Sequence, residues 1–306
     1  MKIIQPRDLS TTANISCLVY GPAGVGKTTL ALSAPNPILI DLDHGLCRVQ
    51  KEYQCPSVQV EKFEDILELL QSEELKTFGT IIIDTFGQFI ECMFEYLANK
   101  NAKLKNYNGQ PTQAGWGQIK TTCKKFLSDI FKINKNFICV AHEQGDKFAG
   151  DEIILRPEII GSSGRELIKL VDLVGYMSIK GGKHTISFDP NDNFVAKNSL
   201  GLSGFIEWKN DNKFFSKIIN KISERREKDN LTRKEYDELL AEQDSKLEKV
   251  GSPEDLELLM KELKDQETKI IWGSRIVFWN KIKKLAKDKF NMEYDNASER
   301  FMACNA

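Results

Sequence analysis

The sequence lacks an excess of charge of either sign. Among its 306 residues, 43 lysines and arginines stand against 44 aspartates and glutamates, which leaves a formal net charge of -1. This balance excludes nucleic-acid binding through a global basic field, so any such binding has to come from local patches. Long apolar runs are also missing: no stretch approaches the ~18 residues of a membrane span, and MKIIQPRDLS at the start has no apolar signal-peptide core. We therefore expect a cytoplasmic protein with no membrane partner.

Paired cysteines are absent as well. The seven cysteines include no CxxC pair, and most stand in apolar runs such as ISCLVY and NFICVA. An odd number without metal-ligand spacing predicts reduced, structural thiols rather than a disulfide framework or a zinc site. The remaining composition, 41% hydrophobic and 28% charged, is typical of a soluble globular protein, and the length suits a core domain with an appendage.

What the sequence does contain is a phosphate-binding motif. The stretch GPAGVGKT matches G-x4-G-K-[ST] and lies between an expected strand at 15–20 and an expected helix from residue 28. Its glycines let backbone N–H groups turn toward phosphates, while the Lys27 ammonium reaches the β- and γ-phosphates and the Thr28 hydroxyl holds Mg²⁺. The alternative is a glycine-rich turn with an incidental lysine. The motif predicts that ATP and Mg²⁺ bind at Gly21, Pro22, Ala23, Gly24, Val25, Gly26, Lys27, Thr28 and Thr29.

A second motif ends in an acid. The apolar run TIII, residues 80–83, stops at Asp84, and parallel α/β sheets bind their ligands at the carboxyl ends of the strands. An aspartate there can hold the Mg²⁺ shell in the Walker B role, together with Thr28. The alternative is that Asp84 caps the following helix.

Two further acids end an additional strand between these motifs. The run PILIDL, residues 37–42, contains Asp41 and is followed by Asp43. P-loop proteins with a strand in this place typically put a catalytic carboxylate near the γ-phosphate, where it orients and activates the attacking water. Asp43, in the turn, is the better candidate, and Asp41 is expected to support local hydrogen bonds. Alternatively, Asp43 caps a short helix that starts at Gly45.

A histidine ends a third expected strand. The apolar run at 137–141 stops at His142 and Glu143. A polar side chain at this strand end can sense the γ-phosphate and report hydrolysis to the following loop, so His142 is a candidate sensor. A lone histidine is also often structural or solvated.

These pieces, in this order, resemble the RecA-like core ATPases, and most closely a phage family of AAA-type nucleotide-binding proteins that includes the Sak-group single-strand-annealing proteins. The resemblance is carried by VYGPAGVGKTTLALSAPNPILIDLDHGL, TIIIDTF and ICVAHE, and extends over about residues 14–208. It implies an α/β fold, a RecA-like P-loop NTPase core with a mostly parallel sheet flanked by helices. It also implies ATP hydrolysis, with Asp43 where RecA-type proteins have a catalytic glutamate and with His142 in the sensor position. A phage protein would work in the cytoplasm of its bacterial host.

The resemblance also implies an assembly. FVAKNSLGLSG is similar to the segment from which RecA-type proteins reach into the ATP site of the neighbouring subunit, which makes Lys197 a trans-acting finger. Ser199 stands where RecA has a second lysine, and this departure bears on the coupling of hydrolysis to DNA. Only about fourteen residues precede the first expected strand, so a homo-oligomeric ring or short stack is expected as much as a filament.

Two segments are candidate contacts for single-stranded DNA. Residues 99–117 stand where RecA-like cores have their first DNA loop, and they combine lysines with aromatic rings, which suits phosphates and stacked bases. The candidates there are Lys103, Lys105, Tyr107 and Trp116. A second expected loop, 144–164, offers Arg156 and, at its end, Arg165 for tracking phosphates. Alternatively, 99–117 is a solvated loop in which Trp116 anchors the next helix, and the acids of DKFAGDE disfavour the second segment.

After about residue 214 the composition changes to lysine- and glutamate-rich helical patterns. We divide the chain into a core, 1–222, and an all-α C-terminal region, 223–306, linked by the highly charged SERREKDNLTRK. Ser252 is an expected helix cap, and lysines crowd the second half of a further expected helix, at 281–289. This last helix can bind DNA or a replication or recombination protein, or it forms a solvated face.

The preferred function is that of an ATP-dependent protein acting on single-stranded DNA in phage recombination, annealing or replication. A helicase loader or protein-remodelling ATPase would use the same nucleotide site and act on a protein through the C-terminal helices. A small-molecule kinase is disfavoured because the sequence shows neither an arginine-rich lid nor an acceptor-pocket signature. If Asp43 is only a cap, the protein is a nucleotide-binding scaffold with negligible turnover.

Overall fold

The computed structural model describes residues 14–147, 153–202, 204–209, 211–264, 274–295, 298 and 300–304, with the backbone alone for 147, 225–233, 264, 274 and 275. A division between Ser223 and Glu224 separates two units. The first unit contains every residue expected to bind the nucleotide or act on it.

A mixed ten-stranded sheet forms the middle of the first unit. The spatial order is β10-β8-β7-β1-β5-β4-β2-β3, with β6 added to β5 and β9 added to β7. The strands are β1 (Ser16–Gly21), β2 (Pro37–Asp41), β3 (Ser57–Gln59), β4 (Thr80–Asp84), β5 (Asn136–Lys147), β6 (Ile153–Pro157), β7 (Leu173–Lys180), β8 (Lys183–Ser187), β9 (Lys197–Asn198) and β10 (Phe205–Glu207). Pairing is parallel from β3 to β7 and antiparallel at β8 and β10. The predicted mostly parallel α/β sheet is confirmed, and β2 is the additional strand expected between the two motifs.

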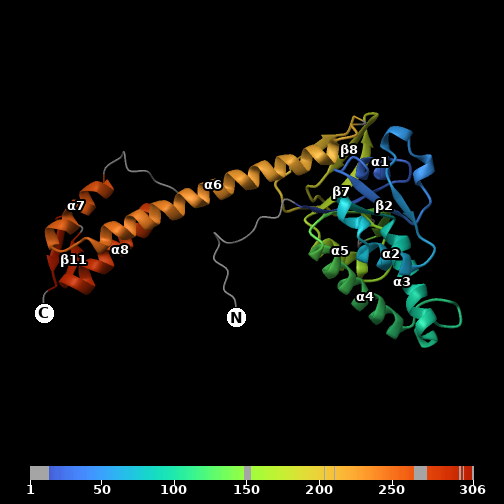
Figure 1. The fold of residues 1–306 in the computed structure, drawn as a ribbon, viewed down its shortest axis with the longest axis horizontal. Helices are drawn as coiled ribbons and strands as arrows, with labels where there is room; N and C mark the ends of the chain where they lie inside the picture. Colours follow the sequence, from blue (N-terminus) through green and yellow to red (C-terminus); the bar gives the residue numbers. More distant parts are fainter. Residues whose placement is uncertain are drawn as a thin grey trace. The chain divides into compact units, whose positions relative to one another are not determined.

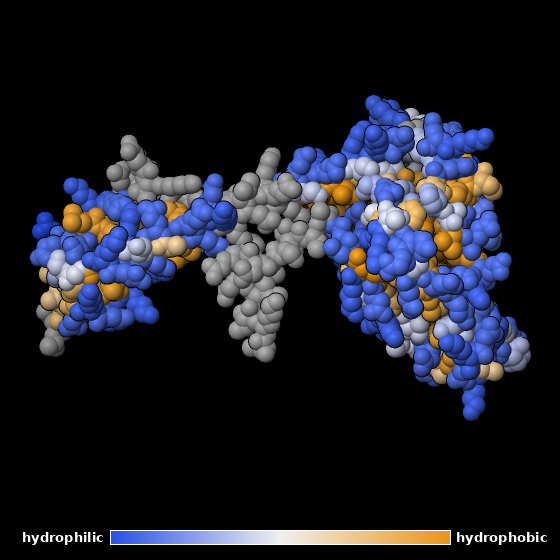
Figure 2. Space-filling view, viewed as in Figure 1, coloured by the Kyte–Doolittle hydropathy of each residue, from blue (hydrophilic) through white to orange (hydrophobic). Residues whose placement is uncertain are grey.

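Alternating side chains give the sheet two apolar faces. In β1, Leu18 and Tyr20 join one buried cluster while Cys17 and Val19 join the other, as the two-residue period of a strand requires. Figure 1 shows the helices around the sheet. The first face is covered by α2 (Phe63–Gln71), α3 (Phe86–Lys100), α4 (Gln113–Lys132) and α5 (Ser163–Leu170), and the second by α1 (Lys27–Ala31) and the start of α6 (Phe214–Glu248). Hydrophilic residues predominate on the outer surface visible in Figure 2, so the apolar side chains are mainly inside.

The carboxyl ends of the parallel strands bring the predicted functional segments to one edge of the sheet. Asp41 of β2 lies opposite Asp84 of β4, and Gly21 of β1 lies opposite His142 of β5. Strand β5 separates β1 from β4, so the phosphate motif and Asp84 approach each other across one intervening strand. Ligands of α/β sheets bind at this kind of edge.

The expectation of a loop over 144–164 is wrong for 144–147 and 153–157, which are strands, while residues 148–152 lie outside the described residues. Strand β5 continues to Lys147 and pairs antiparallel with β6, which puts Gln144 opposite Arg156. The pattern alone did not show this strand, because the extension pairs with a hairpin partner and is only partly buried. The hairpin expected around Gly181 and Gly182 is confirmed: these glycines join β7 to β8 with φ of 56° and 76°, as a two-residue hairpin turn requires.

The second unit has a small core of its own. Helices α7 (Pro253–Lys264) and α8 (Ser274–Phe290) pack with an antiparallel hairpin of β11 (Met292–Asp295) and β12 (Arg300–Ala303). The region expected to be all-α therefore also contains two strands, which are held because Tyr294 and Phe301 lie opposite each other and place their rings against Trp279. The expected link 223–234 is part of α6, since its lysines, arginines and glutamates are strong helix formers. Within the described ranges, no helix combines the length and the apolar character needed to cross a membrane.

Candidate nucleotide-binding site

The phosphate motif forms the turn between β1 and α1. Gly24 and Gly26 have φ of 74° and 93°, in the left-handed region that favours glycine. Gly21 is needed for another reason, because a Cβ there would lie 2.3 Å from the carbonyl oxygen of Met177. The loop therefore depends on its glycines at three positions, and its conformation is of the kind that turns successive N–H groups toward an anion.

Lys27 is a buried cation without an acidic hydrogen-bond partner among the described contacts. Its side chain is 6% exposed, and Nζ donates to the carbonyls of Gly21 at 3.0 Å and Pro22 at 2.8 Å. Burial lowers the pKa of the Lys27 ammonium, and the nearby charges of Asp84, Glu143 and Asp43 oppose that effect. A buried ammonium compensated only in part favours an anionic ligand, and phosphate fits this position.

Thr28 and Asp84 form a direct pair beside Lys27. The Thr28 Oγ1 hydroxyl donates to Asp84 Oδ2 at 2.5 Å, and Asp84 is 4% exposed. Burial raises the pKa of the Asp84 carboxyl, the charge of Asp43 raises it further, and the bond from Thr28 opposes both. The N-terminus of α3 is capped by Thr85, which accepts from the N–H of Gln88 at 3.4 Å. Asp84 is thus left to face the cavity.

The two acids at the end of β2 have different partners. Asp41 accepts from the backbone N–H groups of Gly45 at 2.9 Å and Leu46 at 3.1 Å, so it holds the start of the 3-10 helix η2 (Leu46–Arg48). The carboxylate of Asp43 makes no hydrogen bond to that helix among the described contacts, and it lies 4.0 Å from Nε2 of His142. Asp41 therefore has the supporting position that the sequence assigned to it, and Asp43 lies in the cavity with the phosphate loop.

Two charged residues near this cavity were not assigned roles from the sequence. Arg48 lines it, and its guanidinium donates to the carbonyl of Asp43 at 2.9 Å. The charge of Glu143 raises the pKa of Lys27 against the lowering by burial, and its carboxylate accepts a hydrogen bond from the hydroxyl of Tyr176 at 2.9 Å. The adjacent letters HE at the end of β5 were the only signal for Glu143, and nothing in the sequence pattern marked Arg48.

The cavity between these elements has the size and the chemistry of a nucleotide-phosphate site. Its volume is about 310 Å³, within the range of small-molecule sites. It is lined by Ala23, Gly24, Gly26, Lys27, Thr28, Thr29, Asp43, Gly45, Arg48, Val49, Asp84, Thr85 and His142. The described residues contain no group of three or more His, Cys, Asp or Glu side chains that could hold a metal ion. A Mg²⁺ ion at Thr28 and Asp84 would therefore need phosphate and water oxygens as further ligands, which is how Mg²⁺ commonly binds.

Lys197 lies outside this cavity. Its Nζ donates to the carbonyls of Ile168, Lys169 and Val171, at 3.2, 2.9 and 2.6 Å. These groups lie at the C-terminal end of α5, where a cation is favourable. Within one chain, Lys197 therefore stabilises a helix end and is not brought to the phosphates.

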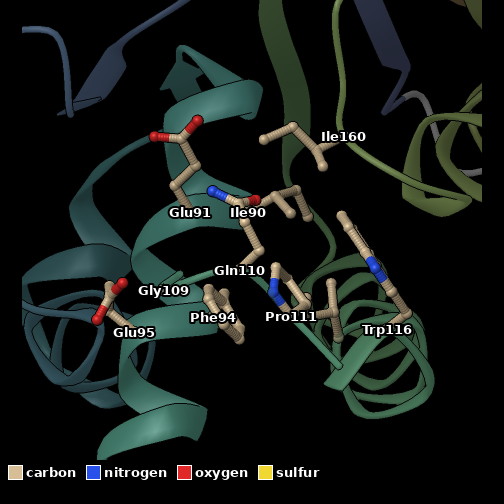
Figure 3. Close-up of a pocket in the computed structure, with 10 residues that line it drawn as sticks. Ile90, Glu91, Phe94, Glu95, Gly109, Gln110, Pro111, Trp116 and Ile160 are labelled. Atoms are coloured by element: carbon tan, nitrogen blue, oxygen red, sulfur yellow. The ribbon is translucent and has the colours of Figure 1, made fainter. Parts of the chain in front are cut away.

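The first candidate DNA segment is structured and partly neutralised. Nζ of Lys105 lies 2.9 Å from a carboxylate oxygen of Glu95, while the Tyr107 ring is 96% exposed. Trp116 is half-buried, and its ring leaves no room for a Cβ on Gly161. Figure 3 shows Trp116 beside a cavity of about 300 Å³, with Glu91 and Glu95 on its α3 side. Trp116 thus packs inward, and Tyr107 is the ring that faces solvent.

The second candidate DNA segment also contains an ion pair. Nε of Arg156 lies 2.6 Å from Asp146, on the neighbouring strand. Arg165 is exposed on α5. Among the described residues, neither Lys103 nor Arg165 has an acidic partner within 4 Å, so these two cations are the more available ones.

Residues 13–200 match the family model of the AAA domain, which includes every residue of the cavity described above. No curated protein matches the chain. The match extends over more than half of the sequence and supports nucleotide binding at this cavity.

Proposed function

The chain belongs to the AAA-domain family of P-loop NTPases, and we propose that it is a Mg²⁺-dependent, RecA-like ATPase that acts on single-stranded DNA in phage recombination, annealing or replication. The position of Asp43 is the observation that supports ATP hydrolysis. Its carboxylate shares a cavity with Lys27, Thr28 and Asp84, while Asp41 holds the neighbouring helix in its place. A carboxylate that lies in a polar cavity and, among the described contacts, accepts no hydrogen bond is suited to act as a base.

The residues divide the work of hydrolysis. The phosphate loop and Lys27 bind the β- and γ-phosphates, and Thr28 with Asp84 holds Mg²⁺, which neutralises phosphate charge when bound. An oxygen of the Asp43 carboxylate accepts a hydrogen bond from the attacking water and then its proton. His142, 4.0 Å away, orients that carboxylate and responds to the presence of the γ-phosphate.

Single-stranded DNA is the proposed effector because the first candidate segment exposes both an aromatic ring and an available cation. Tyr107 can stack on a base, and Lys103 can meet a phosphate. Arg165 offers a further cation on α5. Because the net charge is close to zero, these cations would bind DNA as a local patch and not through a positive field of the whole protein.

Oligomer formation is proposed through Lys197 as a trans-acting finger. The trans role requires Lys197 to leave the carbonyls at the end of α5 and reach the ATP site of a neighbouring subunit. Mixing a Lys197→Ala chain with a Lys27→Ala chain tests this: recovery of ATP hydrolysis in the mixture supports the trans role, and the absence of recovery contradicts it.

A second candidate function is that of a helicase loader or protein-remodelling ATPase. The ion pairs of Lys105 with Glu95 and of Arg156 with Asp146 favour it, because they neutralise cations that a DNA-binding surface would present. The separate core of the second unit gives such a protein a module with which to bind a protein partner.

The deciding experiment is steady-state ATP hydrolysis with and without single-stranded DNA, with Lys27→Ala as the background. Stimulation by DNA supports the recombination function. Hydrolysis that DNA leaves unchanged supports action on a protein partner, and hydrolysis at the background rate contradicts the ATPase assignment.

A further inference from the structure

Two side chains from the antiparallel end of the sheet contact the outer side of the phosphate loop. Nδ1 of His184, in β8, lies 3.0 Å from the carbonyl oxygen of Val25. The indole of Trp208, which follows β10, lies against Gly26: a Cβ on that glycine would be 2.7 Å from Cζ3 of the ring. Neither residue belongs to the G-x4-G-K-[ST] motif, and neither lines the phosphate cavity.

The contact of His184 has a physical reason. In a loop whose N–H groups turn toward phosphates, the carbonyl groups turn away and need donors elsewhere. The Nδ1–H group of His184 supplies such a donor to Val25. Loss of this donor would leave the carbonyl unpaired in a half-buried place, which disfavours this conformation of the loop.

The contact of Trp208 depends on glycine. Gly26 has φ of 93° and no side chain, so the flat ring can lie directly on the backbone. Trp208 is 4% exposed, and it is fixed from two sides: its backbone N–H donates to the carbonyl of His184 at 2.8 Å, and Nε1–H donates to the carbonyl of Asp211 at 3.3 Å. The two rings meet edge to face, with centroids 5.9 Å apart.

The segment after Trp208 also holds the far end of α1. The backbone N–H of Phe215 donates to Oγ of Ser33 at 3.0 Å, and Oγ of Ser216 donates to the carbonyl of Ser33 at 3.0 Å. The piece of chain from Gly26 to Ser33 is therefore held at both ends by residues between His184 and Ser216.

We propose that His184 and Trp208 are positioning residues for phosphate binding, which keep the loop in its binding conformation and report its occupancy. The proposal depends on the proposed nucleotide function. A loop that adopts the binding conformation only part of the time binds ATP more weakly in proportion to that fraction. Occupancy of the loop in turn changes the surroundings of the Trp208 indole.

The first test is equilibrium ATP binding by two variants of the half-buried His184. We expect His184→Leu to weaken binding about 5- to 10-fold, and His184→Asn, which keeps an N–H donor, to bind within about 2-fold of the wild type. Lys183→Ala is the matched control, since Lys183 is exposed on the same strand and pairs with Glu207. Unchanged binding by His184→Leu overturns the proposal, as does equal weakening by His184→Asn. If the wild type itself fails to bind ATP, the nucleotide function fails first.

The second test uses tryptophan emission, which does not depend on hydrolysis. Both the wild type and Trp208→Phe retain Trp116, Trp272 and Trp279, and both are compared at ATP concentrations that saturate them in an independent binding assay. Under these conditions we expect ATP to change the emission of the wild type but not that of Trp208→Phe. An emission change that persists in Trp208→Phe overturns the proposal. So does a wild type that binds ATP with no change in emission.

Discussion

The cations of the phosphate cavity and those of the candidate DNA segments have different partners. Lys27 is buried and, within the described part of the chain, donates only to carbonyl groups, while Asp43 and Asp84 lie nearby. Lys105 and Arg156, by contrast, are each paired with an acid of the same chain. A buried charge compensated only in part is costly and favours a charged ligand, whereas an exposed ion pair is worth only ~0–1 kcal/mol and is readily exchanged. The first region is therefore preorganised, whereas Lys105 and Arg156 of the second can meet DNA phosphates only by giving up their own pairs.

The largest effect should come from Lys27→Ala. Removal of the ammonium deprives the β- and γ-phosphates of their cation, which costs about 3–5 kcal/mol, or at least a hundredfold in ATP affinity. Hydrolysis then falls to background. Isothermal titration with ATP and Mg²⁺ measures the affinity, and Lys51→Ala is the control because Lys51 is exposed and does not line the cavity. If Lys27→Ala bound ATP as tightly as the wild type, the buried cation would not be what binds the phosphates. The contrast between the cavity and the candidate DNA segments would then be wrong.

The next largest effect should separate the two acids at the end of β2. Asp43→Asn is expected to lower the rate of hydrolysis ~10²–10⁴-fold while ATP binding and stability persist, because only the base is lost. Asp41→Asn makes the same change of charge one pleat earlier. Since Asp41 holds the start of η2, the Asp41→Asn substitution should lower the free energy of unfolding by about 1 kcal/mol. It should reduce the rate of hydrolysis less than Asp43→Asn does. Loss of hydrolysis in Asp41→Asn equal to that in Asp43→Asn would contradict the division of roles.

The features that could be predicted from the sequence are those whose pattern lies within a few neighbouring residues. The phosphate motif and the strand ending in Asp84 are local patterns, so their place at one sheet edge was predictable. The contact of Trp208 with Gly26 joins residues far apart in the chain, and no local sequence pattern predicts it. The pair of Lys105 with Glu95 likewise forms only when α3 and the next segment fold together. Asp41, which ends β2, and Asp43, in the turn after it, could be ranked by their positions, but their hydrogen bonds could be known only from the structure.

A smaller effect should appear in the pH dependence of the protein's free energy of unfolding, through the titration of Asp84. Burial raises the pKa of this carboxyl above its ordinary value, so the native state binds the proton more tightly than the unfolded chain does. Stability of the nucleotide-free protein is then lost as pH rises from the ordinary aspartate pKa through the raised native one. Asp84→Asn removes this loss, and we expect its free energy of unfolding to exceed that of the wild type by about 1 kcal/mol at neutral pH, while Mg²⁺-dependent ATP binding weakens.

Urea unfolding across the acid-to-neutral range measures this difference. Asp189 provides the control of opposite sign, because the N–H of Gly204 and the amide of Asn198 lower its pKa. Its stabilising contribution is present above the ordinary aspartate pKa and is lost as pH falls through the lowered one. A difference between Asp84→Asn and the wild type that grows toward acid pH would contradict the assignment of a buried, proton-binding Asp84.

The smallest effects concern single-stranded DNA, and they test whether the paired cations can be released. Glu95→Gln frees Lys105, so we expect DNA affinity to rise about 2- to 3-fold at low salt.

Lys103→Ala should weaken DNA binding more than Lys105→Ala does, because only Lys105 is engaged by an acid. Tyr107→Ala should cost about 1 kcal/mol of binding, at the lower end for a stacked base, and leave stability unchanged since the ring is exposed. Fluorescence anisotropy of a labelled strand at several salt concentrations measures all four. If Glu95→Gln and Tyr107→Ala both bind DNA as the wild type does, this segment does not contact DNA, and the proposed role of Lys105 and Tyr107 is wrong.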